Sequence, residues 1–427
     1  MNFIFVSTTC SGEKYKKVFE SRINKTIDPM QKFLLQIMQG IAKDSNNKVY
    51  SISILPVSKS CYTPKKVEAD YDDENGISFL YPSFLNGSLT RPVSVFFSVY
   101  KSLKKSIKKY NRNETILVTD PLNPYISIAA RMVARFNGIK TMAIVTDLPM
   151  LATNMKQNKE SFHRRFLRNM VERLSDYEAK RYNSYIFLTE TMNEVVNHKG
   201  LPYIVIEGTA IGFNNSHTRK IEASNRVFVY AGGVYEKYGV KRLVDAFCKA
   251  NIKNVELHIY GSGNLVDYIK EASKKYTNVK YCGCVLNSEL QQIEKDADLL
   301  INPRFSDEEY TKYSFPSKIL EYLSSGTAVL STRLAGIPME YDPYMFWIED
   351  EREESMIQTL VDLSTTPKEV LISKGKAGQD YVLTCKNNVV QGNRISDFAK
   401  HILGQNDNKK RQLDEKNRLK RVIEWKK

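Results

Sequence analysis

The chain has 427 residues, with 42% hydrophobic and 26% charged residues. This length exceeds one ordinary core and fits two domains of about 200 residues each, and the composition is that of a globular protein. The net charge of +15 predicts an anionic partner such as nucleic acid, an acidic membrane surface or a phosphorylated substrate. A lysine-rich, solvated surface would produce the same charge.

Much of the positive charge is concentrated in two segments. In Lys101–Lys109, apolar residues recur at helical spacing and lysines cover the opposite face. From Lys409 to Lys427, apolar residues that include Trp425 are interspersed among basic ones. Because a basic amphipathic helix is suited to lie on an anionic bilayer, we expect peripheral contact with an anionic membrane. A frayed and solvated terminus is the alternative for the second segment.

The cysteines and the start of the chain indicate the compartment. None of the six cysteines forms a C-x-x-C pair, and Cys282-Gly-Cys284 is too tight for a standard zinc site, so we expect reduced thiols in a cytoplasmic protein. The five histidines show no ligand spacing, and no metal is expected. The first residues predict a strand rather than a signal peptide, and no run of about 18 apolar residues occurs.

Short apolar runs alternate with helical patterns in two successive series. The first begins with a strand at Asn2–Ser7 and continues through helices such as Met30–Ala42 and Phe162–Tyr182. The second begins with a strand at Val227–Tyr230, after a polar stretch at Gly212–Ser224 that is typical of a linker. This alternation predicts an α/β protein of two doubly wound, Rossmann-like domains with a cleft between them.

Two glycine-rich loops follow strands of the second series. Gly232-Gly233 comes after Val227–Tyr230, and Gly261-Ser262-Gly263 comes after Val255–Tyr260. Glycine there allows a ligand to approach the backbone, and N–H groups at the start of a helix attract phosphate. The same glycines are also compatible with tight turns that have no ligand, because neither loop is a full G-x-G-x-x-G fingerprint.

The segment after Leu300 is the most informative part of the sequence. Arg304 ends a predicted strand, and a polar loop follows from Ser306 to Tyr313. Ser314 is expected to cap a helix over Lys318–Leu323, with Pro316 in its first turn and Gly326 as its stop.

This segment resembles the family 4 retaining glycosyltransferases of the GT-B fold, in particular the bacterial capsular and cell-surface polysaccharide enzymes. The likeness covers the C-terminal half and is weak over the N-terminal half; it runs through YAGGVYEKYGV, LHIYGSGN, YCGCV, ADLLINPR, SFPSKILEYLSSG and GIPMEY. It implies transfer of a sugar, with retention of anomeric configuration, from a UDP-linked donor to a glycan or lipid-linked acceptor in surface polysaccharide synthesis. It also implies no cofactor and no metal.

The resemblance assigns a role to each part of the chain. Residues 1–215 are expected to form the acceptor-binding domain and residues 222–385 the nucleotide-sugar-binding domain. A C-terminal helix at 386–405 is expected to pack back toward the N-terminal domain, and residues 406–427 form a basic tail.

Glu321 is similar to the family residue that binds the ribose, since a carboxylate can accept hydrogen bonds from both ribose hydroxyls. By position, Lys318 is the first candidate to neutralise the diphosphate, as a catalytic residue, and Arg304 is the next. The expected nucleotide-sugar-binding residues are Gly232, Gly233, Gly261, Gly263, Arg304, Ser314, Ser317, Lys318 and Glu321.

The sequence departs from the family pattern at three positions. The first glutamate of the paired-glutamate motif falls on Tyr313, and Glu308 or Glu309 would have to replace it. The phosphate-binding Arg–Lys pair falls on Gly233 and Tyr238, neither of which is charged, although Lys237 is adjacent.

In the N-terminal half, Ser11-Gly12 matches the position of the family's small-residue loop on the acceptor side. Asp147 ends a predicted strand where many relatives carry a histidine, and its carboxylate is suited to orient or deprotonate an acceptor hydroxyl as a catalytic residue. Asp120 is a second candidate. Capping of a loop at a strand end is the alternative for both.

Three other functions compete with glycosyl transfer. A sugar-nucleotide 2-epimerase shares the fold, but the shortage of histidines disfavours it. A non-catalytic GT-B partner subunit is favoured by the missing glutamate and the missing Arg–Lys pair. Nucleic-acid binding is suggested by charge alone, and we expect none because no recognition motif accompanies the charge.

Overall fold

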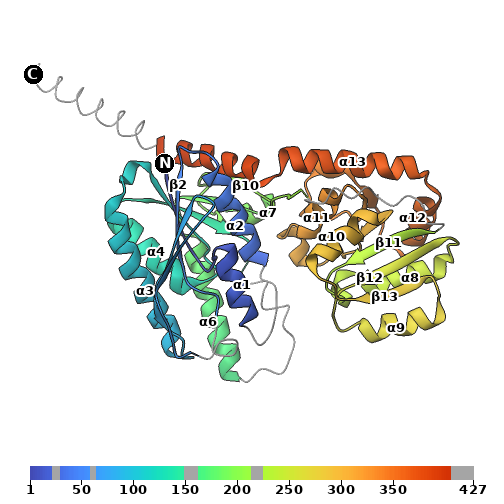
Figure 1. The fold of residues 1–427 in the computed structure, drawn as a ribbon, viewed down its shortest axis with the longest axis horizontal. Helices are drawn as coiled ribbons and strands as arrows, with labels where there is room; N and C mark the ends of the chain where they lie inside the picture. The colour runs from blue at the N-terminus through green and yellow to red at the C-terminus, as the bar shows by residue number, and fades with distance from the viewer. Residues whose placement is uncertain (22–28, 58–63, 149–161, 213–224, 405–427) are drawn as a thin grey trace, which may run out of the picture. The chain divides into compact units, whose positions relative to one another are not determined.

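The chain folds into two compact units (Figure 1). The structure, a computed structural model, describes residues 1–21, 29–57, 64–148, 162–212 and 225–404. The first unit contains Met1–Ile206 together with the chain from Asn388 onward, and the second contains Glu207–Asn387. The predicted linker at Gly212–Ser224, apart from residue 212, and the predicted basic tail lie outside the described residues.

The first unit is built on an eight-stranded sheet in the order β10-β9-β8-β7-β1-β2-β5-β4. All neighbours are parallel except β4, which runs antiparallel to β5 at one edge. Its strands are β1 (Asn2–Ser7), β2 (Lys48–Ser53), β4 (Asp70–Glu74), β5 (Ile77–Tyr81), β7 (Thr115–Thr119), β8 (Lys140–Val145), β9 (Ser184–Phe187) and β10 (Tyr203–Val205). A separate antiparallel pair is formed by β3 (Lys66–Val67) and β6 (Phe84–Leu85).

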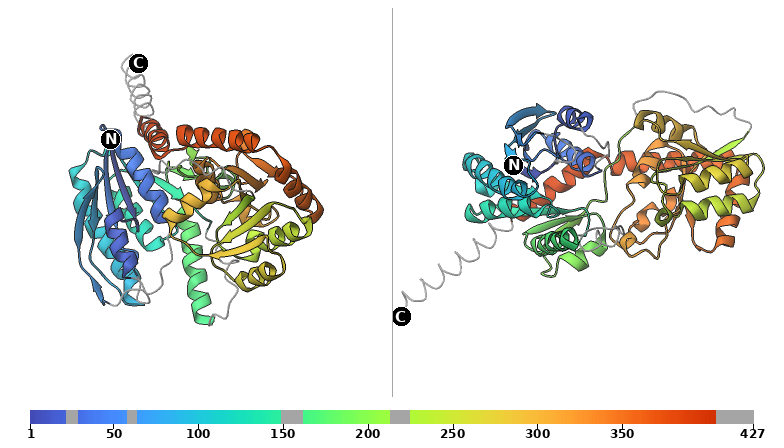
Figure 2. Two further views of the ribbon diagram at one scale, coloured as in Figure 1. Left: turned by 45° about the vertical axis from the view of Figure 1, so that its right-hand side comes forward. Right: turned by 90° about the horizontal axis from the view of Figure 1, so that it is seen from below.

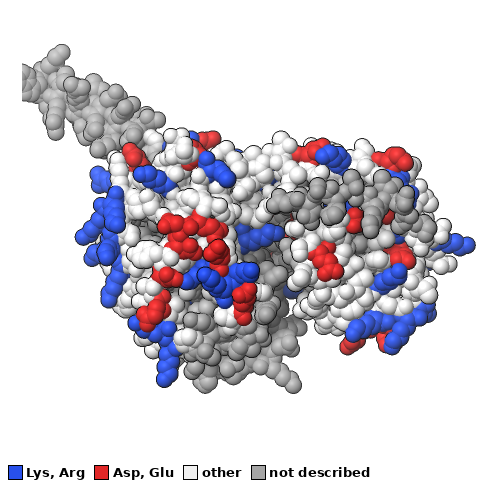
Figure 3. Space-filling model, viewed as in Figure 1, with Lys and Arg blue, Asp and Glu red and all other residues white. Residues whose placement is uncertain are grey.

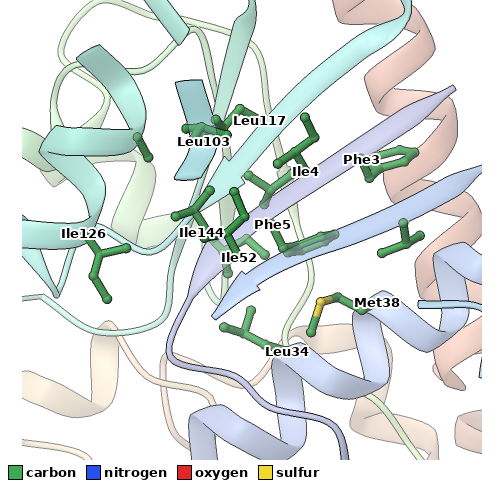
Figure 4. Packing of buried hydrophobic residues seen from close by; sticks show 14 of the residues in the cluster. Phe3, Ile4, Phe5, Leu34, Met38, Ile52, Leu103, Leu117, Ile126 and Ile144 are labelled. Carbon is green, nitrogen blue, oxygen red and sulfur yellow. The ribbon is translucent and has the colours of Figure 1, made fainter. Parts of the chain in front are cut away.

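Helices cover both faces of this sheet. They are α1 (Gly12–Glu20), α2 (Pro29–Ala42), α3 (Thr90–Ser106), α4 (Pro124–Phe136), α6 (Phe162–Ala179), α7 (Glu190–Val196) and a helix over residues 388–404, with 3-10 turns at Ile107–Lys109 and Arg112–Glu114. Because β1 is central, its apolar residues Phe3, Ile4 and Phe5 are all buried. Figure 4 shows them between Leu34 and Met38 of α2 and residues of α3 and α4.

The helix at residues 388–404 belongs to the first unit. Its apolar residues Ile395, Phe398, Ala399 and Ile402 join the core around β1, and it lies beside α2 in the two views of Figure 2. The crossing with α2 is close, because a Cβ atom added at Gly40 would lie 1.8 Å from the Asn388 carbonyl oxygen.

The second unit is built on a six-stranded parallel sheet in the order β13-β12-β11-β14-β15-β16. Its strands are β11 (Arg226–Ala231), β12 (Val255–Tyr260), β13 (Val279–Gly283), β14 (Leu299–Asn302), β15 (Ala328–Thr332) and β16 (Phe346–Ile348). Its helices and 3-10 turns are η3 (Glu236–Tyr238), α8 (Val240–Ala250), α9 (Val266–Lys275), α10 (Asn287–Asp296), η4 (Glu309–Lys312), α11 (Ser317–Ser325), η5 (Met339–Tyr344), α12 (Glu353–Thr365) and α13 (Lys368–Cys385).

Strand β11 shows why this sheet must be covered on both faces. Successive side chains point to opposite sides of a strand. Phe228 and Tyr230 enter the core under α8, α9 and α12, whereas Val229 and Ala231 enter the core under α11. A strand buried on both faces is typical of a parallel α/β sheet.

The prediction of two doubly wound α/β domains is confirmed, and several elements lie where the alternation placed them. The division between the units falls at residues 206 and 207, ahead of the polar stretch that the sequence indicated. Glu207 is already part of the second unit, where it pairs with Lys386 and accepts a hydrogen bond from Tyr341. No helix in the described part of the chain is long and apolar enough to cross a bilayer.

The Gly40 crossing can be tested by substitution. Gly40→Ala is expected to lower the free energy of unfolding by about 2 kcal/mol or more, because the added methyl overpacks the contact with Asn388. Thermal and denaturant unfolding measure the change. Gly404→Ala is the control, since nothing lies within 4 Å of its added Cβ. Equal stability of the two variants would contradict the close crossing.

Candidate functional site

The candidate donor site lies at the carboxyl ends of β11 and β14. The order of the second sheet reverses between these strands, since the chain passes from β11 outward to β13 and then returns to β14. Open α/β sheets bind ligands at such a switch point. Gly232-Gly233 follows β11, and Arg304 follows β14.

Helix α11 is fixed at this point by a buried tyrosine. The Tyr322 hydroxyl donates to the Ala231 carbonyl at 3.0 Å and accepts from the Ala231 N–H, also at 3.0 Å. The ladder between β11 and β14 pairs only Phe228 and Val229, so the end of β11 has no strand on that side. The phenol therefore satisfies backbone groups that would otherwise be buried without partners.

The two glycine loops pack against each other. A Cβ atom at Gly261 would lie 1.8 Å from the Gly232 carbonyl oxygen, and one at Gly263 would lie 1.9 Å from the Val234 carbonyl oxygen. The Gly232 N–H donates to Tyr260, and the Gly261 N–H donates to Gly283. Close backbone contact thus accounts for these glycines, and these two N–H groups already have partners. A role of the loops in nucleotide binding stays a prediction.

Lys318 and Glu321 are brought together at the head of α11. The Lys318 ammonium lies 3.0 Å from a Glu321 carboxylate oxygen and 4.0 Å from Glu294 of α10. Burial by itself lowers the pKa of Lys318, but the two carboxylates outweigh it, and the net pKa is raised. The side chain therefore carries a full positive charge at neutral pH while about a quarter of its surface remains accessible (27%).

Arg304 lies in the same cluster. Its guanidinium is 5.0 Å from the centroid of the Tyr238 ring. Burial raises the pKa of the Tyr230 phenol, and the charges of Arg304 and Lys318 both oppose that rise, so both cations act on one buried side chain. Tyr238 is a position where the family pattern would have a cation, and here a cation from another element reaches it.

The backbone of the loop that carries Arg304 is held by Arg242 of α8. The Arg242 guanidinium donates to the Pro303 carbonyl at 3.0 Å and to Glu351 at 2.8 Å, and it lies 4.3 Å from the centroid of the Phe305 ring. Glu351 in turn accepts from the Ser306 N–H at 2.7 Å. This clamp fixes the start of the loop on both sides of Arg304.

The segment before α11 differs in detail from the prediction. The cap predicted for Ser314 is wrong, because α11 begins at Ser317 with Pro316 at the N-cap position. The ring of Pro316 carries no hydrogen-bond acceptor, so α11 begins without a side-chain cap. Ser317 is exposed, whereas Ser314 and Tyr313 are half-buried. The predicted stop is confirmed, since Gly326 has a φ of 81°.

The loop at 306–313 contains the short turn η4 rather than irregular backbone alone. Glu308 and Glu309, the candidates to replace the missing glutamate, are both exposed. The phenol of Tyr310 donates to the Lys237 carbonyl at 3.3 Å. The turn is therefore anchored beside η3, and its two carboxylates remain open to solvent.

In the first unit, Ser11 is fully buried and caps α1. Its hydroxyl accepts from the Lys14 N–H at 3.2 Å and donates to Asp72 of β4. Gly12 follows, and a Cβ atom there would lie 3.2 Å from the Glu74 carboxylate. The Glu13 N–H donates to the same carboxylate at 3.3 Å. Carboxylates of the chain itself thus already occupy the N-terminus of α1, where an anionic ligand would otherwise be stabilised.

Asp147 and Asp120 each follow a strand of the first sheet. Asp147, after β8, is exposed at its surface, yet the surrounding protein desolvates it and raises its pKa above the ordinary value, against the lowering effect of the Leu148 N–H. Asp120, after β7, accepts from the Leu122 N–H at 2.9 Å. Asp147 likewise accepts from the Leu148 N–H at 2.8 Å, so both residues make the loop-capping contact that was the alternative to a catalytic role.

Two contributors were missed by the sequence analysis. Glu294 lies on α10, where Leu290 and Ile293 mark the apolar face, and a carboxylate on that face was the available signal in the sequence. Arg242 gave no such signal, because its partners are distant in sequence. Within the described residues, no group of three or more His, Cys, Asp or Glu side chains is placed to hold a metal ion.

The second unit is similar to a known protein family. Residues 225–366 match the family model "Glycosyl transferases group 1". None of the curated protein sequences matches the chain.

Among solved structures, sucrose-phosphate synthase from Thermosynechococcus elongatus is similar at 11% identity with a TM-score of 0.65, over 95% of this chain and 100% of that one. A trehalose-6-phosphate structure from E. coli, bound with UDP-2-fluoro glucose, is similar at 10% identity with a TM-score of 0.61, over 93% and 99%. The lipopolysaccharide outer core galactosyltransferase WaaB is similar at 12% identity with a TM-score of 0.59, over 93% and 99%.

These findings support one class of protein. The fold is GT-B, with two Rossmann-like domains, as predicted. The matched segment contains all of the residues that converge at the ends of β11 and β14. Together, the matched family and the fold support a glycosyltransferase.

The Arg242 clamp provides a test of how the site is supported. Arg242→Ala is expected to lower the free energy of unfolding by about 2 kcal/mol or more, because it leaves Glu351 and two loop carbonyls without their cation. Denaturant unfolding gives the value. Lys241→Ala is the matched control, since its more exposed pair with Asp245 should contribute less than about 1 kcal/mol. If both variants are equally stable, the loop does not depend on Arg242.

Proposed function

We propose that this protein is a retaining glycosyltransferase that moves a sugar from a UDP-linked donor to a glycan or lipid-linked acceptor in surface polysaccharide synthesis. The observation that carries the proposal is the pairing of Lys318 with Glu321 at the head of α11, inside the segment that matches the glycosyltransferase family. The resemblance to family 4 enzymes supports retention and the surface-polysaccharide role.

In the proposed donor complex, Glu321 binds the ribose and Lys318 binds the diphosphate. A carboxylate accepts from two vicinal hydroxyls, which suits a ribose. The ammonium is already charged and partly accessible. Lys318 also lies one residue beyond the start of α11, so the positive end of the helix dipole adds to its charge.

Stabilisation of the leaving group is the proposed source of catalysis. A nucleoside diphosphate gains negative charge as the glycosidic bond breaks, and fixed cations near it lower the barrier. Lys318 and Arg304 are the cations available at this end of the sheet. Because Arg304 stacks on Tyr238 and its loop is clamped by Arg242, little reorganisation is required during the reaction.

The position of Arg304 bears on the alternative of a non-catalytic partner subunit. That alternative was favoured by the absence of charge at Gly233 and Tyr238. Arg304 supplies a cation beside Tyr238, and this contact favours an active enzyme. Tyr313 still replaces the expected glutamate, so the contacts to the donor sugar differ from those of the family, and Glu308 and Glu309 are the nearest carboxylates in sequence.

The choice of UDP rests on the relatives and on the resemblance. The E. coli structure is bound with UDP-2-fluoro glucose, and a trehalose-phosphate synthase from Burkholderia xenovorans is UDP-forming. Gly232, Gly233, Gly261, Gly263, Ser314 and Ser317 line the proposed nucleotide-sugar site together with the charged residues.

On the acceptor side, we propose that Asp147 orients or deprotonates the acceptor hydroxyl and that the Ser11-Gly12 loop lies near it. The raised pKa of Asp147 makes its carboxylate a stronger base than an ordinary aspartate. The protein is proposed to act on the cytoplasmic face of the membrane, where the basic tail after Gly404 and the lysines of Lys101–Lys109 contact anionic lipid.

Glu321→Ala is expected to abolish sugar transfer while the fold is retained, because the ribose loses its acceptor. Transfer is measured by release of UDP from a panel of UDP-sugars with a glycan acceptor, and the fold is checked by thermal unfolding. Glu271→Ala is the matched control, since Glu271 forms an exposed pair with Lys274 at the same kind of spacing. Full activity of Glu321→Ala would show that the ribose site has been misassigned.

The raised pKa of Asp147 predicts that the activity depends on pH. The acidic limb of kcat/KM is expected above the ordinary pKa of an aspartate, and Asp147→Asn should lose this limb together with most of the activity. Because the raised pKa means that ionised Asp147 opposes folding, the variant should be at least as stable as the wild type at neutral pH. An unchanged limb in Asp147→Asn would assign the base to another residue.

A further inference from the structure

Helix α6 has a stripe of large apolar side chains on its outer surface. Between 37% and 57% of the surface of each is exposed; the residues are Phe166, Leu167, Met170, Leu174 and Tyr177. Their spacing of three, four or one residue places them on one side of the helix. We call these five residues the α6 stripe.

The α6 stripe is not the face by which the helix packs on its own unit. That face is formed by Ser175, Glu178 and Ala179, all of which are buried. Glu178 forms a two-pronged pair with Arg131 of α4, with distances of 2.6 and 2.9 Å. The helix is thus held from one side, and the apolar stripe projects from the other.

Basic side chains flank the stripe, and the acidic ones of α6 are paired. Arg165 and Arg173 are exposed, and the guanidinium of Arg181 lies 3.8 Å from the centroid of the Tyr177 ring. Glu172 pairs with Arg168, and Asp176 pairs with Lys180. The surface around the stripe is therefore cationic.

Helix α3, which lies in the same layer of helices as α6, adds further positive charge to this surface. It packs on α4, which in turn packs on α6. Its outward residues Val93 and Phe97 are exposed, and Lys101, Lys104 and Lys105 follow toward its end. Figure 3 shows Lys and Arg gathered along the edge of the first unit over α3.

We propose that the α6 stripe is the surface by which the first unit docks on an anionic lipid bilayer. Apolar side chains on one face of a helix with cationic residues beside them fit the boundary between acyl chains and anionic headgroups. The inference rests on the proposed membrane-associated function and assigns the contact to a surface outside the donor site. Five large apolar side chains that are exposed side by side on one helix mark an interaction surface, and the positive charge beside them favours an anionic partner.

The α6 stripe and the arginines beside it have separable effects. The apolar residues contribute affinity that depends weakly on salt, because burial of apolar surface is not screened. The arginines contribute a preference for anionic lipid that falls as ionic strength rises.

The test uses the full chain and two kinds of vesicle, phosphatidylcholine alone and phosphatidylcholine mixed with phosphatidylglycerol. The double variant Phe166→Ser, Met170→Ser is expected to bind the anionic vesicles about tenfold more weakly than the wild type in sedimentation. The matched control is Val370→Ser, Ile372→Ser, which removes two exposed apolar side chains from α13 and should bind as the wild type does.

A second variant tests the charge without changing the apolar residues. Arg165→Gln, Arg173→Gln is expected to reduce the preference for anionic over neutral vesicles, and high salt should reduce the preference of the wild type in the same way. A chain ended after Gly404 is compared in parallel. The truncated chain should also bind anionic vesicles more weakly than the wild type. Its reduction in affinity should add to that of the α6 variants if the tail and the α6 stripe are separate contacts.

The outcomes separate the docking surface from the proposed activity. UDP release with a soluble acceptor should be unchanged in all α6 variants, because none of these residues belongs to the donor site. Wild-type binding by the Phe166→Ser, Met170→Ser variant would overturn the proposal. The proposal would also be overturned if light scattering gave a lower molecular mass for the Phe166→Ser, Met170→Ser variant than for the wild type, since the stripe would then contact a second copy of the chain. If the wild type lacks transfer activity but the vesicle result holds, the proposed function fails and the docking surface remains.

Discussion

The pair of hydrogen bonds between Tyr322 and Ala231 is the constraint on which the candidate site depends. Where β11 separates from β14, both backbone groups of Ala231 face a side chain instead of a strand. Because the phenol is buried and makes both bonds, α11 cannot slide or rotate without leaving polar groups unsatisfied. Lys318 lies one turn before Tyr322 and Glu321 directly before it, so one tyrosine fixes the position of both.

The charges gathered at this point are nearly balanced before any ligand arrives. Lys318 and Arg304 are positive, and Glu294 and Glu321 are negative. The buried Glu294 carboxylate lies behind the ammonium and helps to keep its pKa raised. In the proposed complex, a diphosphate would meet cations that are already charged, and the Glu321 carboxylate would exchange its pairing with Lys318 for ribose hydroxyls. This arrangement suits a ligand that carries both a ribose and a diphosphate.

Most of the helices and strands of the second unit could be predicted from the sequence, and fewer of those of the first unit. Strand β12, for example, could be predicted to the residue, because Val255–Tyr260 is a short apolar run bounded by polar residues and glycine. The strand β4 could not, since Asp70–Glu74 is nearly all acidic and forms only as an antiparallel edge beside β5. Side-chain pairing between distant residues does not appear in local periodicity, and for that reason the Arg242 clamp could not be predicted. The carboxylate of Glu294 on the apolar face of α10 was visible in the sequence, but its partner Lys318 was not. The cap assigned to Ser314 was wrong, because Pro316 takes the N-cap position.

The central claim is that the second unit binds a nucleoside diphosphate at the head of α11, and a thermal-shift panel of nucleoside diphosphates and nucleotide sugars tests it most directly. A ligand present at about 100 times its Kd adds about 2.7 kcal/mol to the apparent stability. The account predicts that UDP and a UDP-sugar raise the Tm of the wild type and do not raise that of Glu321→Ala. A panel in which no nucleotide shifts the wild-type Tm, or in which the Glu321→Ala variant shifts equally, would contradict it.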